Sequence, residues 1–360
     1  MSLETPLPHL PRVQALRGLA AAAVTLSHLH VVEARHVPRP LLGNWAELGL
    51  WGVDLFFVIS GFIMVYVTWS APRTLANLGD YLVRRTGRIY PLYWAVSAAL
   101  LLVWLWRPDM VFASNNPDIL RSFLLIPQPQ LPLLAVGWTL VYEMYFYIVF
   151  GGLLLLPRRA LPFGLLAWAA VLCLGWAIVR PPASDAFAHH IFNPIGLEFV
   201  AGALVGWIYV RGSRRDRPWL AALALAATLL LLGSALRLHP DIDGLATDWV
   251  ARTAWFGSAA VCAFAAMLVS GLRMGRAAVW LGDISYSLYL THVLTLSAVG
   301  RLLGPHLGEG MAGSAAMLAL LVAATLAVAR LTHAWIERPA ARLLKRLRPR
   351  AGPSAVRSPA

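Results

Sequence analysis

The sequence predicts an all-α membrane protein, a polytopic helical bundle with about ten transmembrane helices. Of the 360 residues, 59% are hydrophobic and only 13% are charged, and the mean hydropathy is +0.66. These values lie outside the range of soluble domains. The apolar residues are gathered in runs of about 20, which is the length that an α-helix needs to cross the hydrocarbon core of a bilayer.

Ten apolar runs of spanning length follow one another along the chain. We expect transmembrane helices near 13–32, 46–69, 88–106, 137–156, 161–179, 191–210, 219–236, 247–270, 277–300 and 314–336. Together they predict a single transmembrane domain over residues 1–340. Residues 341–360 are basic and then rich in Pro, Ser and Ala, so we expect a disordered cytoplasmic tail there.

The distribution of basic residues predicts the orientation of the bundle. The formal net charge is +13, which in a soluble protein is typical of nucleic-acid binding. Here the basic residues occupy short connectors between apolar runs, so we expect a lipid bilayer as the partner and no nucleic acid. Alternate connectors carry 22 and eight of the Lys and Arg residues. The positive-inside rule then places both termini in the cytoplasm.

The longest connector, about 107–136, contains an apolar piece that is too short to span the bilayer. We expect a re-entrant or interfacial element there. Cys173 and Cys262 both fall inside apolar runs, and no spacing of Cys or His residues predicts a disulfide framework or a metal site.

The first apolar run carries one guanidinium and one imidazole. Arg17 and His28 are separated by 11 positions, which on a helix leaves them about 20° from eclipsed and ~16 Å apart along the axis. The small residues of 18–23 lie between them and would let neighbouring helices approach closely. We interpret the helix as the wall of a path, with Arg17 at its cytoplasmic mouth and the titratable His28 at depth.

Three carboxylates are expected near the depth of His28. Counting inward along alternating helices places Asp54, Glu143 and Glu198 in the outer third of the bilayer. Each would cost roughly 2.5–3.5 kcal/mol if it were alone in hydrocarbon, so we expect one polar cluster around His28. In such a cluster His28 has the chemistry of a general base, and Glu143 and Asp54 are candidates to orient it. A helix-packing network of the same groups is the alternative.

A second cluster of charge precedes the third apolar run. Arg84, Arg85 and Arg88 are packed closely enough to need an anion, and phosphates suit guanidinium groups. Lipid headgroups are the alternative partner, because the other cytoplasmic connectors are also basic. Tyr93 belongs to an aromatic belt in which stacking on a nucleotide base is one of two interpretations, the other being an interfacial anchor.

Five motifs in order resemble the acyltransferase-3 family of integral-membrane acyltransferases. The matching residues are the Arg17/His28 pair, Phe56, Phe57, Ser60 and Gly61, then Arg85, Arg88, Ile89 and Pro91, then Trp138 and Glu143, and finally the run Ser285 to His292. The similarity extends from Val13 to Pro339, and VQALRGLAA is similar to exopolysaccharide acetyltransferases of this family.

The resemblance implies an enzyme of the bacterial inner membrane. It implies acyl-CoA, with acetyl-CoA as the expected donor, no metal, and a polysaccharide or lipid-linked sugar as the acceptor. It also implies that His28 is the catalytic histidine and that Arg17, Arg85 and Arg88 serve the donor, with Arg84 and Tyr93 beside them.

Two other classes of function remain open at this point. Buried histidines and carboxylates also build proton relays, so a proton-coupled transporter is the main alternative. Inverted repeats with broken helices would favour it, and the sequence shows none. A non-catalytic scaffold for polysaccharide export fits the bundle but leaves the arginine cluster unexplained. The acceptor, the length of the acyl chain and the oligomeric state are not fixed by the sequence.

Overall fold

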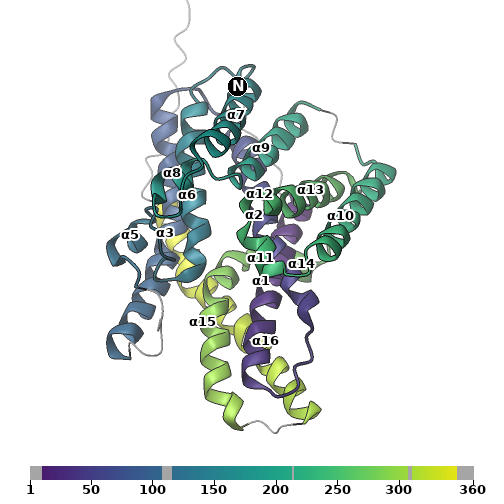
Figure 1. Ribbon diagram of the computed structural model, residues 1–360. Helices are drawn as coiled ribbons and strands as arrows, with labels where there is room; N and C mark the ends of the chain where they lie inside the picture. The colour runs from purple at the N-terminus through teal and green to yellow at the C-terminus, as the bar shows by residue number, and fades with distance from the viewer. Residues whose placement is uncertain (1–9, 108–115, 213–214, 307–309, 347–360) are drawn as a thin grey trace, which may run out of the picture.

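The computed structural model describes residues 10–107, 116–212, 215–306 and 310–346. In these ranges the chain forms helices and no strand. Figure 1 shows α3, α5, α6 and α8 on one side of the bundle, α10 and α13 on the other, and α1 and α2 between them. The α-helices are α1 (Pro11–His36), α2 (Trp51–Thr68), α3 (Leu75–Trp106), α5 (Ile119–Leu124), α6 (Trp138–Leu153), α7 (Leu161–Val179), α8 (Ala186–Ile191), α9 (Gly196–Arg211), α10 (Pro218–Leu238), α11 (Ile242–Thr247), α12 (Trp249–Arg252), α13 (Ser258–Val269), α14 (Arg276–Asp283), α15 (Ser285–Leu303), α16 (Met311–Thr332) and α17 (Arg338–Arg346).

The predicted polytopic bundle is confirmed. Within the described ranges, nine helical segments are long and apolar enough to cross a membrane. They are 11–36, 44–68, 75–106, 135–153, 161–179, 186–211, 218–238, 249–269 and 311–346. The run expected at 277–300 is divided at Ile284 into α14 and α15, and the polar residues of α15 keep its mean hydropathy low, which is why it is not among the nine.

Alternating spans predict that successive connectors lie at opposite ends of the bundle. Contacts between the helix ends and connectors agree with this arrangement. At one end of the bundle, Arg12 binds the side chain of Asp216 and the carbonyl of Leu272. Arg158 bonds the carbonyl of Ser70 at the same end. At the opposite end, the hydroxyl of Ser314 donates to the carbonyl of Arg39, so the start of α16 lies against the α1–α2 connector.

The third spanning helix is longer than the sequence predicted. It was expected to begin at residue 88, but α3 begins at Leu75, where Thr74 caps it by accepting from the amide of Asn77. Pro91 lies inside α3 and does not end it. Arg84, Arg85 and Arg88 are therefore placed on a continuous helix rather than in a loop.

The expected re-entrant element is α5, with the residues that follow it. The hydroxyls of Tyr90 and Tyr93 and the indole of Trp94 donate to the carbonyls of residues 122–124. These three side chains lie near the middle of α3, so the connector folds back to that height. Leu133 and Leu134 are buried before α6 begins at Trp138, so α6 starts inside the bundle.

Small residues on α1 allow close helix packing, as expected. A Cβ added at Gly18 would meet the backbone of Leu281 and Gly282, and one added at Gly282 would meet the carbonyl of Gln14. The start of α2 packs in the same way, because Gly52 lies against the carbonyl of Ala20. Helix α1 is therefore held closely between α2 and α14.

The last described helix, α17, packs against the N-terminal half of α3. The side chain of Leu344 fills the space beside Gly87. The tail predicted for 341–360 begins within this helix, and its residues from 347 onward lie outside the described residues.

Candidate functional site

A narrow cavity of about 80 Å³, which we call the arginine slot, lies between α1, α2, α3, α6 and α15. Arg17, Arg85 and Arg88 line it together with Ser60, Glu143 and Tyr147, and mostly apolar and aromatic side chains of α2, α3, α6 and α15 form the rest of its wall. The three guanidiniums come from two helices far apart in the sequence. The slot therefore joins two of the motifs that the sequence singled out.

The guanidiniums of the arginine slot have few partners. Arg88 is exposed, and neither Arg85 nor Arg88 makes a hydrogen bond to another described residue. Arg85 is only 8% exposed and its Nε is buried without a partner. Its guanidinium faces the rings of Tyr81 and Tyr147 at 5.8 and 5.9 Å. Because a buried guanidinium without acceptors is costly, the slot is suited to bind an anion.

One carboxylate balances part of this positive charge. Glu143 accepts hydrogen bonds from the hydroxyl of Ser60, at 3.2 Å, and from Tyr147. It makes no ion pair within 4.0 Å with the described basic side chains, although its charge acts on Arg17 and Arg85. The slot thus keeps a positive excess.

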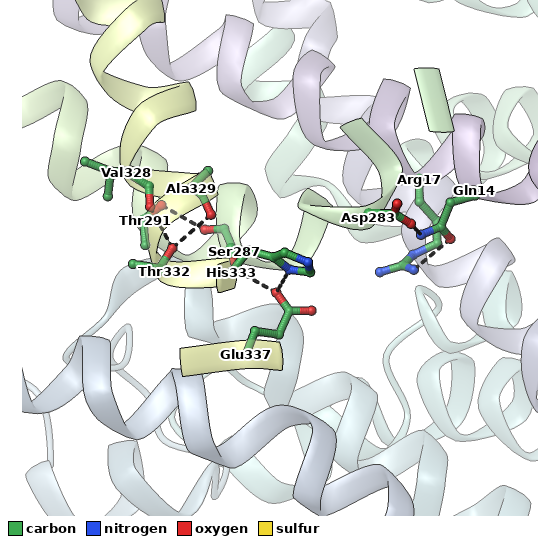
Figure 2. Close-up of polar contacts among 10 residues, drawn as sticks. All are labelled: Gln14, Arg17, Asp283, Ser287, Thr291, Val328, Ala329, Thr332, His333 and Glu337. Atoms are coloured by element: carbon green, nitrogen blue, oxygen red, sulfur yellow. Dashed lines mark hydrogen bonds and ion pairs between the residues drawn. The ribbon is translucent and has the colours of Figure 1, made fainter. Parts of the chain in front are cut away.

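A second carboxylate, Glu337, lies beside the slot in a polar network at the end of α16. It accepts from the hydroxyl of Ser287 at 2.6 Å and pairs with Nδ1 of His333 at 2.9 Å. Figure 2 shows Arg17 and Glu337 extending toward the same region from opposite helices. Within the described part of the chain, Arg17 donates only to Gln14, at 3.1 Å, and Gln14 in turn donates to Asp283.

The imidazole of His28 lies next to a second histidine. The ring centroids of His28 and His292 are 4.9 Å apart in an edge-to-face arrangement. Nδ1 of His28 is 2.9 Å from the carbonyl of Val24, so Nδ1 carries the proton in the neutral ring. Nε2 of His28 is then a free proton acceptor. His292 has the same arrangement, because its Nδ1 bonds the carbonyl of Tyr289 and its buried Nε2 has no partner.

The open path predicted between Arg17 and His28 is interrupted. Tyr289, which lines the arginine slot, has its ring centroid 5.8 Å from that of His292, and His28 is not among the described residues that line the slot. The Tyr289 hydroxyl is held by Thr139 at 2.8 Å and by the carbonyl of Val136 at 3.2 Å. The small residues of 18–23 pack neighbouring helices instead of leaving a channel.

The predicted cluster of carboxylates around His28 is not formed. Asp54 is fully buried and makes a two-pronged ion pair with Arg252, with N–O distances of 3.0 and 2.8 Å. Glu198 is also buried, beside Gly257 in the helical segment that follows Arg252, so it lies in the same region as Asp54. Glu143 lies in the arginine slot. The four groups therefore occupy three separate places.

The re-entrant connector explains the position of Glu143. The sequence placed it at the depth of His28 by starting the fourth spanning helix at the outer face. Because α6 begins inside the bundle, Glu143 lies deeper and meets Ser60 and Tyr147. The position of Asp54 is explained by its ion pair. Its partner, Arg252, is the basic residue that the predicted span 247–270 contains.

Two residues expected to serve the donor lie outside the arginine slot. Arg84 faces away from it and pairs with Asp80 at 2.8 Å, one turn earlier on α3. Tyr93 is fully buried, and its hydroxyl holds the carbonyl of Ser122. Arg84 and Tyr93 are thus engaged by partners elsewhere, and neither lines the slot with Arg85 and Arg88.

Several slot residues were not singled out from the sequence as binding groups. They include Tyr147, Thr139, Tyr286 and Tyr289. A signal existed for Tyr147, because it follows Glu143 by four residues and therefore lies on the same helix face. Tyr286 and Tyr289 belong to the polar face of α15. The sequence indicates this face, because the predicted span 277–300 contains many polar residues.

Comparison with known proteins gives the family. Residues 10–333 match the family profile of acyltransferase-3, described as "Acyltransferase domain". The chain is 32% identical to the "Exopolysaccharide production protein ExoZ" of Rhizobium meliloti over 86% of this chain and 93% of that protein. It is 30% identical to the "Acyltransferase MdmB" of Streptomyces mycarofaciens over 94% of both chains.

A more distant relative carries additional sequence. The "Peptidoglycan O-acetyltransferase OatA" of Listeria monocytogenes is 23% identical over 92% of this chain but only 56% of its own length. No solved structure matches the chain. The match of the family profile and the relatedness to ExoZ and MdmB favour an enzyme over a transporter or a scaffold. The chain belongs to the acyltransferase-3 family and is a multi-pass membrane acyltransferase.

Proposed function

We propose that this protein is an O-acetyltransferase of the bacterial inner membrane. It moves an acetyl group from cytoplasmic acetyl-CoA to a hydroxyl of an exported or cell-surface polysaccharide, or of its lipid-linked precursor. The observation that carries the proposal is the arginine slot, in which Arg17, Arg85 and Arg88 converge. To the residues that the structure describes, the three guanidiniums make one hydrogen bond, from Arg17 to Gln14. The names of two relatives, which refer to exopolysaccharide production and to peptidoglycan O-acetylation, support a glycan acceptor.

The arrangement of the arginines fits a long anionic donor. Arg88 is exposed at the mouth of the slot, whereas Arg85 is buried further in. The phosphates of coenzyme A bind the guanidiniums through charge-assisted hydrogen bonds. The narrow, largely apolar slot then receives the thin pantetheine arm, which directs the thioester toward Tyr289 and Phe56.

His28 is the general base of this mechanism. Its Nε2 takes the proton of the acceptor hydroxyl, and the hydroxyl oxygen attacks the thioester carbonyl. The tetrahedral intermediate expels the thiolate of coenzyme A, and the imidazolium returns the proton to it. The products are the O-acetyl ester and free coenzyme A. Since Tyr289 stands between the slot and His292, its side chain has to turn away when the thioester reaches His28.

The two carboxylates contribute in different ways. Glu143 faces the donor and, with Ser60 and Tyr147, fixes the lining of the slot at the level of the arginines. Asp54 acts indirectly: it holds Arg252, whose guanidinium lies 5.5 Å from the ring centroid of Trp138 at the start of α6. Neither is needed as a proton acceptor.

The proposal is tested with purified protein and radiolabelled acetyl-CoA. We expect His28→Ala to lower acetyl transfer to glycan by at least about 100-fold, the usual contribution of a general base. Its affinity for acetyl-CoA, measured by equilibrium binding, stays near that of the wild type, because the arginine slot is unchanged.

His306→Ala is the matched control, since His306 is an exposed histidine at the end of α15. It should transfer at the wild-type rate. Undiminished transfer by a folded His28→Ala variant would remove His28 from the mechanism. Absence of acetyl-CoA binding by the wild type would contradict the proposed donor.

A further inference from the structure

A second cavity, of about 620 Å³, opens at the end of the bundle opposite the one at which Arg88 of the arginine slot is exposed. We call it the aromatic groove and define it by six rings: Trp138, Tyr142, Trp176, His189, His190 and Trp249. They come from α6, α7, α8 and α12. The facing wall is the segment 127–132, with the sequence PQPQLP.

The rings of the aromatic groove form a continuous surface. Trp249 lies at its centre, with centroid distances of 5.8 Å to Trp138, 6.2 Å to Tyr142 and 6.2 Å to His189. His189 in turn contacts Trp176 at 5.3 Å. A surface of this kind presents flat apolar ring faces to a ligand in the cavity.

Polar groups are placed among these rings. His190 is only 7% exposed, and its ring stacks on that of Tyr142 with a centroid distance of 3.9 Å. Its Nε2 has no hydrogen-bond partner among the described residues. Gln128 and Asp248 also line the groove. Each is held by the protein, since the amide of Gln128 bonds Asp118 and Ser122 and Oδ1 of Asp248 accepts from the amides of residues 250 and 251. A cavity of this size with flat rings and a few converging polar groups is typical of a site for a small polar molecule that also has apolar faces.

We infer that the aromatic groove binds the sugar units of the acceptor glycan. The faces of a pyranose ring carry C–H groups that pack on indole and phenol rings, while its hydroxyls bond side chains such as His190, Gln128 and Asp248. The basic cluster of the slot is absent from the lining of the groove, so the groove does not compete for the anionic donor. This inference rests on the proposed function.

The position of the groove relative to the arginine slot supports this assignment. Trp138 faces the groove, whereas the next residue, Thr139, faces the slot. Between the two cavities lies Phe57, which lines the slot and contacts Trp138 and Tyr142 at 6.4 Å each. An acceptor in the groove and a donor in the slot therefore approach the same turn of α6 from opposite sides.

Direct binding tests the inference without requiring transfer. The probe is a mixture of oligosaccharides prepared from the producing strain's own surface polysaccharide by alkaline de-O-acetylation and partial acid hydrolysis. Its binding to the detergent-purified protein is measured by calorimetry in the absence of acyl donor. We expect Trp249→Ala to weaken binding by at least about 10-fold, as for a central aromatic anchor, and Trp249→Phe to stay within about threefold.

The matched control is Trp106→Ala, because Trp106 is 77% exposed at the end of α3 and outside the groove. It should bind the oligosaccharides as the wild type does. Trp176→Ala, at the edge of the groove, provides a second variant if Trp249→Ala does not fold, and we expect it to weaken binding at least about threefold. No binding by the wild type, or equal affinities in the groove variants and Trp106→Ala, would overturn the inference.

The outcome separates this inference from the proposed function. If oligosaccharide binding depends on Trp249 but labelled acetyl-CoA is neither bound nor used, the groove stands as a glycan site and the acetyl transfer is wrong. If transfer proceeds and Trp249→Ala leaves the KM for the oligosaccharide unchanged, the groove is wrong and the acetyl transfer stands. Loss of transfer with unchanged oligosaccharide binding in His28→Ala is the result that supports both.

Discussion

Two buried arginines of this protein have opposite surroundings. Arg252 is 4% exposed, binds Asp54 through two nitrogens and donates its third group to the carbonyl of Ala246. Arg85 is 8% exposed, yet it makes no hydrogen bond to another described residue, and its guanidinium lies beside the rings of Tyr81 and Tyr147. Both guanidiniums are removed from water, but only one of them has its donors satisfied.

The difference separates a structural charge from a binding charge. A buried ion pair with complete hydrogen bonding holds helices together, as Asp54 and Arg252 hold α2 to α12. A buried guanidinium without acceptors raises the free energy of the folded protein, because its N–H groups have lost water without gaining a hydrogen bond. A bound anion supplies the missing acceptors. The arginine slot is therefore read as a ligand site and the Asp54–Arg252 pair as part of the scaffold.

The strongest test of this comparison removes Asp54. We expect Asp54→Ala to destabilise the protein by about 3–5 kcal/mol, because Arg252 is left buried without its partner. The measurement is thermal or denaturant unfolding of the detergent-purified variant. The double change Asp54→Leu with Arg252→Met should recover much of this loss, and a single variant as stable as the wild type would contradict the structural role.

A second test removes the unpaired guanidinium. Arg85→Ala should raise the Kd for acetyl-CoA by roughly 10- to 100-fold, since charge-assisted hydrogen bonds to phosphate are lost. The melting temperature should change little, because no protein partner is abandoned. Arg84→Ala is the matched control: Arg84 lies one residue earlier but pairs with Asp80 outside the slot, so its donor affinity should equal that of the wild type.

The smallest effect is expected at an exposed ion pair. Arg12 and Asp216 are 2.7 Å apart, much like Arg252 and Asp54, but the side chain of Asp216 is 52% exposed whereas that of Asp54 is fully buried. The hydrogen bond from Arg12 holds the pKa of Asp216 below its ordinary value, so its contribution is present at neutral pH and is lost as the pH falls through that lowered pKa. Water screens this pair, so Asp216→Asn should leave the melting temperature unchanged at pH 7. A loss comparable to that of Asp54→Ala would show that burial does not decide the strength of these pairs.

The fold followed from the sequence because hydropathy and length constrain a membrane helix strongly. Nine of the ten expected spans appear within the described residues, and the tenth is divided at Ile284. The error at α3 has a physical reason. Its first turns carry Arg84, Arg85 and Arg88, so hydropathy does not mark them as part of a span, although they continue the helix.

The candidate site was predicted in part. Arg17, Arg85, Arg88 and Glu143 are brought to one cavity, and His28 lies beside a second imidazole. The sequence failed where depth was inferred from the assumed start of a helix. Glu143 was placed with His28 because the connector before α6 was not known to fold into the bundle. Asp54 was placed with His28 by counting depth along α2, and Arg252, inside the predicted span 247–270, was not recognised as its partner.

The most direct test of the central claim compares two donors. Acetyl-CoA and S-acetyl-pantetheine share the thioester arm, but only the former carries the nucleotide phosphates that the arginine slot is expected to hold. We predict that the wild type binds acetyl-CoA more tightly by at least about 100-fold, and that the Arg85→Ala/Arg88→Ala double variant binds both donors with nearly equal affinity. A double variant that keeps the full preference for acetyl-CoA would contradict the account.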